Sequence, residues 1–243
     1  MQSSRVILQF LCTAILGFSV SLSLKAQPAF SEGVLTYKAD TVRRLEASPA
    51  GYIISQVVVY KKLDQLRIET LRVNKFNRTD IQKYIQIRNK KGIYLFLESS
   101  DSIRNAVANF AMFISYEEEK THRANRILNG STSNYKVDKV LKNIKWLNLP
   151  AQKLRLKGGQ NEEESEIVFT NSLDIPIGLV LDSPLAALSG TPLEFVHCEH
   201  GWMTRLSADK LKLEKVSTSL FQIDPKLKIM SNEEVLQGVS DFK

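Results

Sequence analysis

Apolar and polar residues alternate along most of the chain after residue 30. In the segment 33–40, Leu35, Tyr37 and Ala39 alternate with polar residues, which is the period of a half-buried strand. Further strands are predicted at 52–60, 84–88 and 93–97, and the turn residues 89–92 join the last two into a hairpin. Because both alternating sets within 93–97 are apolar, this strand should be covered on both faces.

The same alternation returns after Pro150. Strands are predicted at 151–159 and 164–170, with a polar tip between them, and four more segments follow up to residue 217. The total is about ten strands, without an internal repeat, a low-complexity stretch or a Pro/Gly/Ser-rich linker. We therefore expect residues 27–243 to form one mainly β domain.

Two segments between the strand regions have a different pattern. Ser100-Asp101-Ser102 favours a helix start and Gly130 a helix stop, so a helical insertion is predicted at about 101–128. Its apolar face would carry Ile103, Val107, Phe110, Ala111 and Ile114. Residues 135–147 fit either a helix or a strand. As a helix, this lysine-rich segment would be amphipathic and suited to peripheral contact with an anionic membrane.

The first 26 residues are typical of a secretory signal peptide. Arg5 precedes an apolar run, Val6 to Leu24, and Ala26 supplies a small residue before cleavage. A membrane anchor is the alternative, because the run is just long enough to span a bilayer, but several polar residues dilute it. A lipidated Cys12 does not fit, because the apolar run continues beyond it. The expected location is the periplasm or the outside of the cell.

Removal of residues 1–26 changes the charge and the cysteine content. It leaves 31 of the 33 basic residues against 26 acidic ones, so the net charge falls from +7 to +5. This excess is spread along the chain without interleaved aromatic residues, which argues against nucleic-acid binding. Cys198 becomes the only cysteine, so the chain forms no internal disulfide and its apolar core must hold the fold.

The densest group of reactive side chains is His197-Cys198-Glu199-His200. In a strand, Cys198 and His200 share one face and provide at most half of a metal site. The simpler interpretation is a cysteine in the core with histidines near a turn at the surface. Cys198 also has no evident base and orienting group for nucleophilic catalysis. We predict no catalytic residues, no metal and no cofactor, and hence no enzyme.

Short patterns at both ends of the exported chain resemble a known group of proteins. They are Phe30-x-Glu-Gly-Val-Leu-Thr-Tyr37, Gly190-x-Pro-Leu-Glu194, and the segment 216–230 with Ser219-Leu220-Phe221 and Pro225. Together they resemble an uncharacterised family of exported Gram-negative proteins similar in fold to LolA, the periplasmic lipoprotein carrier. The resemblance implies a curved antiparallel half-barrel sheet covered by helices, a mainly β (α+β) fold.

The resemblance also implies a function in binding or carrying a hydrophobic small molecule, a lipid or an acyl chain. The helix at 101–128 would then act as a removable lid over the inner face of the sheet. The residues expected to face the ligand are Leu95, Leu97, Val107, Phe110 and Ile114. The alternative is a cell-envelope module that has a solid core and meets a protein partner.

Overall fold

The computed structural model describes residues 30–44, 51–101, 109–128, 135–158, 163–176, 185, 188, 190–199 and 202–240. The expected signal peptide lies outside these ranges. The strands, in chain order, are β1 (Glu32–Arg44), β2 (Tyr52–Lys62), β3 (Gln65–Asn74), β4 (Ile81–Asn89), β5 (Gly92–Ser99), β6 (Phe110–Ile114), β7 (Lys136–Trp146), β8 (Leu149–Gly158), β9 (Glu163–Thr170), β10 (Thr191–Glu199), β11 (Trp202–Lys212) and β12 (Lys228–Ser231). Two α-helices, α3 (Tyr116–Leu128) and α5 (Asn232–Ser240), and a short 3-10 helix, η2 (Thr218–Phe221), complete the described elements.

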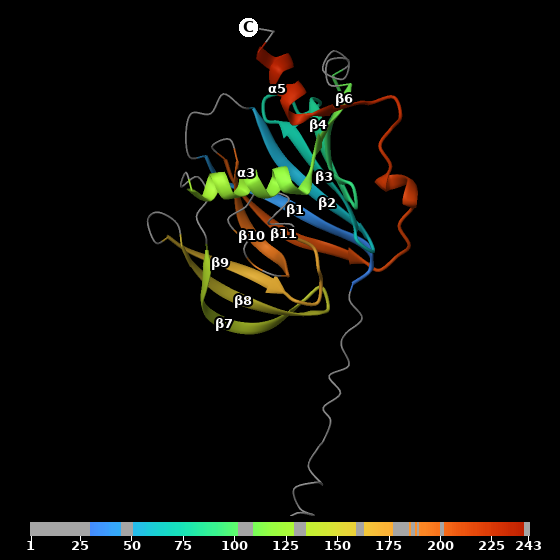
Figure 1. Cartoon of the computed structure of the whole chain (residues 1–243). Helices are drawn as coiled ribbons and strands as arrows, with labels where there is room; N and C mark the ends of the chain where they lie inside the picture. Colours follow the sequence, from blue (N-terminus) through green and yellow to red (C-terminus); the bar gives the residue numbers. More distant parts are fainter. Residues whose placement is uncertain are drawn as a thin grey trace, which may run out of the picture.

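All twelve strands belong to one sheet. Their order is β12-β6-β5-β4-β3-β2-β1-β11-β10-β9-β8-β7, so β12 and β7 are the two ends. Neighbouring strands are antiparallel except β12, which runs parallel to β6. Figure 1 shows the sheet strongly curved, with β7, β8 and β9 running across the direction of β2, β3 and β4. We call the concave side the inner face and the convex side the outer face.

The predicted fold class, a curved antiparallel half-barrel covered by helices, is wrong. The chain is nearly all strand, its single sheet is mixed, and the two described α-helices do not form a covering layer. The main reason lies in 110–114, of which Phe110, Ala111 and Ile114 were expected on the apolar face of a covering helix. These residues form β6, where Leu95 of β5 lies opposite Met112. A run of five apolar residues fits a strand as well as a helix, and pairing with β5 decides between them.

Of the helix expected over 101–128, residues 102–108 lie outside the described residues, and the described helical part is α3. Ser115 caps it: its hydroxyl accepts a hydrogen bond from the Glu118 amide, and the Glu118 carboxylate accepts one from the Ser115 amide. This reciprocal pair is a capping box, and the hydrogen bonds from Ser115 lower the pKa of Glu118. Ser231 and Glu234 form the same arrangement at the start of α5.

The ambiguous segment 135–147 is a strand. Val137 and Val140 are three residues apart, yet they lie opposite Leu156 and Leu154 of β8, which share a face. Two β-bulges make this possible, because the register shifts between Val137 and Lys139 and again between Val140 and Lys142. The apolar spacing therefore resembled a helical stripe although the backbone is extended.

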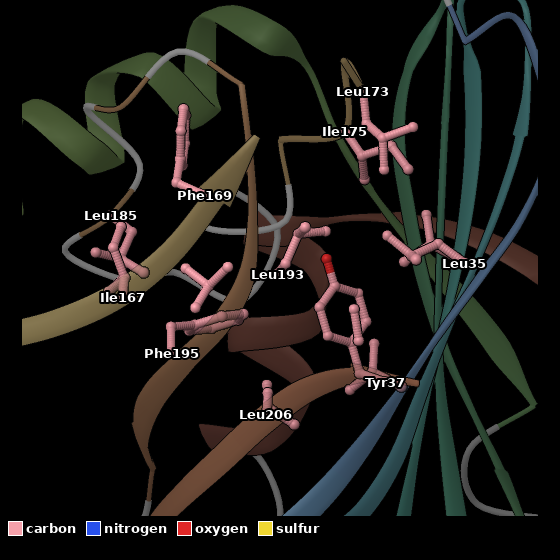
Figure 2. Packing of buried hydrophobic residues seen from close by; sticks show 14 of the residues in the cluster. Leu35, Tyr37, Ile167, Phe169, Leu173, Ile175, Leu185, Leu193, Phe195 and Leu206 are labelled. Carbon is pink, nitrogen blue, oxygen red and sulfur yellow. The ribbon is translucent and has the colours of Figure 1, made fainter. Parts of the chain in front are cut away.

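The main core lies on the inner face, between β1, β2, β8–β11 and the chain that joins β9 to β10. Leu173, Ile175 and Leu185 of this connection pack inside the sheet. Figure 2 shows Leu173 and Ile175 near Leu35, and the Tyr37 ring below Leu193. The interior of this half is thus filled by the protein's own chain.

Buried polar groups fix the filling segment in place. The hydroxyl of Thr191, which is fully buried, accepts a hydrogen bond from the Ile175 amide and lies 3.0 Å from the Leu173 carbonyl oxygen. The Tyr37 hydroxyl donates to the Pro192 carbonyl at 2.8 Å, and burial raises the pKa of Tyr37. The Lys61 ammonium donates to the Asp174 carbonyl at 2.6 Å. Pairing offsets the cost of removing these groups from water.

A second, smaller core lies on the outer face. Residues 213–227, here called the strap, contain η2 and place Val216 and Phe221 against Ile85, Ile87 and Tyr94. The Val216 amide donates to the Glu32 carboxylate at 2.8 Å, and the Lys62 ammonium donates to the Val216 carbonyl at 2.8 Å. The prediction that strand 93–97 needs cover on both faces is confirmed for Ile93 and Tyr94, which are both buried.

Candidate functional site: the inner face of β4, β5, β6 and β12

The other half of the inner face carries apolar side chains that are only half-buried. Register places Leu95 opposite Met112, and Ile93 opposite Ile114. Because strand residues alternate between faces, Leu97 and Phe110 lie on this same face. We call the half-buried set the apolar ladder; its members are Leu95, Leu97, Phe110, Met112 and Ile114. The ladder is a row of apolar groups that still meets solvent.

The parallel strand β12 extends the ladder by one residue. Met230 lies beside Met112, and like it is half-buried. Methionine side chains are unbranched and polarizable, so this end of the row can adapt to differently shaped apolar groups. The next residue toward the N-terminus, Ile229, is 54% exposed and belongs to the opposite face.

Polar side chains border one side of the ladder. Tyr84 of β4 lies opposite Leu97 and is 38% exposed. The guanidinium carbon of Arg72 lies 4.0 Å from the centre of the Tyr84 ring, which is a cation–π contact. Gln82, one position along the same face of β4, is buried near the Tyr84 hydroxyl. This border therefore combines a positive charge with an amide beside the apolar row.

An ion pair lies further along the same strand, where Arg88 is opposite Ile93. Both guanidinium nitrogens Nη1 and Nη2 of Arg88 lie 2.8 Å from the carboxylate of Glu119 in α3. The Arg88 side chain is only 7% exposed, and bidentate pairing of this kind is the strong form of the interaction. Tyr116 adds a hydrogen bond from its hydroxyl to the Asn89 carbonyl at 2.8 Å, and burial raises its pKa. These contacts attach the start of α3 to the inner face.

The predicted ligand-facing residues come together, although by a different route. Leu95, Leu97, Phe110 and Ile114 share the inner face of two paired strands, instead of a strand and a helix. Val107 lies outside the described residues. The sequence interpretation missed Met112, Met230, Tyr84 and Arg72. Alternation along β4 and β6 could have indicated Tyr84 and Met112, but the pairing of β12 with β6 had no local signal.

The His197–His200 group does not gather into a site within the described residues. Register puts Cys198 on the outer face, where it is exposed, and His197 on the inner face, where it is 6% exposed. The expectation of a core cysteine with surface histidines is therefore wrong at these two positions, and His200 lies outside the described residues. Among the described residues, no group of three His, Cys, Asp or Glu side chains could hold a metal ion.

No family model matches the chain, and no curated protein matches its sequence. Within the described part of the chain, none of the helices has the length and apolar character needed to cross a membrane.

Proposed function

We propose that this protein binds a hydrophobic ligand, a lipid or an acyl chain, on the apolar ladder and does so without catalysing a reaction. The observation that supports this most directly is the half-buried state of five neighbouring apolar side chains on the inner face of the sheet. Small-molecule sites are lined mainly by apolar side chains, with a few placed polar groups. The proposal keeps the expected export to the periplasm and the resemblance to an exported Gram-negative family, but not the helix-covered fold that this resemblance implied.

The lid mechanism is not part of this proposal. Phe110 and Ile114 are strand residues of the sheet, and the described start of α3 is polar. The ligand would instead lie along the ladder, with its chain across Leu95 and Met112. Arg72, which stacks on Tyr84 at the border, would face an anionic head group such as a carboxylate. An amphipathic ligand therefore fits this surface better than a purely apolar one.

The test uses dansyl-undecanoic acid as a fluorescent fatty acid and the double variant Leu95→Gln/Met112→Gln. Losing about 1 kcal/mol of apolar contact at each position would weaken binding roughly 30-fold. Ile229→Gln is the matched control, because it removes an exposed apolar residue from the other face of the neighbouring strand. Absence of uptake by the unaltered protein, or equal affinity in the double variant and the control, would contradict the proposal.

A second candidate function is a cell-envelope module that binds a protein partner and no lipid. The filled half of the inner face favours it, because the sheet interior there is occupied by the chain itself. Native mass spectrometry of protein purified from envelope fractions separates the two candidates. Co-purified lipid supports the ligand proposal, whereas a stoichiometric protein partner without lipid supports the envelope module.

A further inference from the structure

The β7–β8 hairpin concentrates positive charge on one side of the sheet. Three of its cross-strand pairs, directly opposite in register, join residues of like charge: Lys136 with Lys157, Lys139 with Arg155, and Lys142 with Lys153. Residues opposite each other on antiparallel strands share a face, so all six cations lie on the outer side, away from Leu154 and Leu156. We call these six residues the basic face.

Like charges at directly opposed positions destabilise a sheet. Lys153 pairs with Glu166 at 2.6 Å, and Lys157 lies 3.6 Å from Asp138. The two strands of the hairpin contain one acidic residue, Asp138, against the six cations of the basic face. The fold tolerates this repulsion where a neutral or opposite-charge pair would be more stable.

Protection of the sheet edge explains only part of the pattern. Lysines on an edge strand hinder unwanted pairing with other chains, and β7 is the end strand of the sheet. The cations of β8 have no such role, because β8 lies between β7 and β9. Because the cluster of cations continues from the end strand β7 onto β8, we interpret it as a surface that binds anions.

The shape of β7 indicates which kind of anionic partner fits. An acidic peptide added as a further strand would need an unbroken backbone edge. The bulges after Val137 and after Val140 interrupt that edge twice, which hinders strand addition. The side chains of the basic face, by contrast, are presented from the face of the hairpin and suit a broad array of anionic groups.

We infer that the basic face docks this protein onto an anionic lipid bilayer. Clustered lysine and arginine residues bind such surfaces by adding many small electrostatic contributions, which salt weakens. The docking is peripheral and uses the outer side of the hairpin, whereas the apolar ladder is at the other end of the sheet. The inference is therefore independent of the proposed ligand.

The experiment measures co-sedimentation of the full chain with two kinds of vesicle, phosphatidylcholine alone and an equal mixture with phosphatidylglycerol. The triple variant Lys136→Gln/Lys139→Gln/Lys142→Gln should bind the anionic vesicles roughly 100-fold more weakly. The control triple Lys91→Gln/Lys212→Gln/Lys226→Gln removes three exposed lysines elsewhere and should retain binding. Replacing Lys136, Lys139 and Lys142 by arginine should also retain binding.

Two further measurements, the Tm of the variant and the salt dependence of binding, test the same inference. The glutamine triple at the basic face should have an unchanged or higher Tm, because it removes three like-charge pairs, so its loss of binding is not unfolding. Binding should fall as salt rises. Equal weakening in both glutamine triples, equal binding to both vesicles, or tighter binding to soluble poly-glutamate than to anionic vesicles would overturn the inference.

Discussion

The two halves of the inner face differ in what covers them. Over β1, β2 and β8–β11, described residues of the connection between β9 and β10 pack inside the sheet, and leucines such as Leu193 are fully buried. Over β4–β6, the apolar ladder remains half-buried and is bordered by Arg72, Tyr84 and Gln82. One curved sheet thus has a core that the chain itself packs and a surface where apolar side chains still contact solvent. The first half should determine stability, and the second should determine binding.

The largest expected effect is a difference in stability between two leucine-to-alanine variants, one in each half of the inner face. Leu193→Ala should lower the free energy of unfolding by about 3–4 kcal/mol, because it leaves a cavity in a filled interior. Leu95→Ala should cost only about 1 kcal/mol, because that side chain is partly solvated before the change. Urea unfolding followed by circular dichroism measures both. Similar losses in the two variants would remove the distinction between the halves.

A smaller effect is expected from the polar anchor of the filled half. Thr191→Val keeps the shape but removes the hydroxyl that contacts Leu173 and Ile175, leaving buried backbone groups unpaired. We expect a loss of about 2 kcal/mol. Thr191→Ser retains the hydroxyl and is the control. Thermal or urea unfolding measures the stability of both variants. If Thr191→Ser were less stable than Thr191→Val, packing of the methyl groups, and not hydrogen bonding, would hold the segment that carries Leu173 and Ile175.

The smallest effect concerns the outer face and depends on pH. The Val216 amide, the main cause, and the nearby Lys62 together lower the pKa of Glu32 below its ordinary value of 4.5. A carboxyl with a lowered pKa stabilises the folded state at neutral pH, and this contribution is lost as the pH falls through the folded-state pKa. Below the ordinary value, the Glu32–Val216 contact should therefore weaken and the strap should loosen.

Hydrogen exchange detects this change directly. Amide exchange in residues 213–221 should increase at acidic pH more than exchange in β2 or β3, after correction for the intrinsic pH dependence. Glu32→Gln should show the faster exchange already at neutral pH and lose the extra acid response. An acid response of the same size in Glu32→Gln would mean that another group controls the strap.

Much of the strand pattern was predictable, and the hairpin of β4 and β5 shows why. Alternation at 84–88 and 93–97, with turn residues between them, predicted the observed pairing of Tyr84 with Leu97 and Arg88 with Ile93. The apolar ladder was predicted in part, because Leu95 and Leu97 lie in that strand. Phe110 and Ile114 were identified as ligand-facing but assigned to a helix. The position of Arg72 over Tyr84 depends on the pairing of β3 with β4, and the strand pattern alone did not indicate it.

The sequence by itself determined the mainly β character, because the period-two alternation is a local property of each strand. Only the tertiary structure decided the conformations of 110–114 and 135–147. In 110–114, the apolar run pairs with β5 and β12 as a strand. In 135–147, two bulges change the spacing of the apolar residues along the strand. Tertiary structure also decided what fills each face, because Ile175 belongs to the same core as Leu35, and Val216 to the same core as Ile87, across long stretches of sequence. Contacts between distant segments follow from packing the whole chain, so no local pattern contains them.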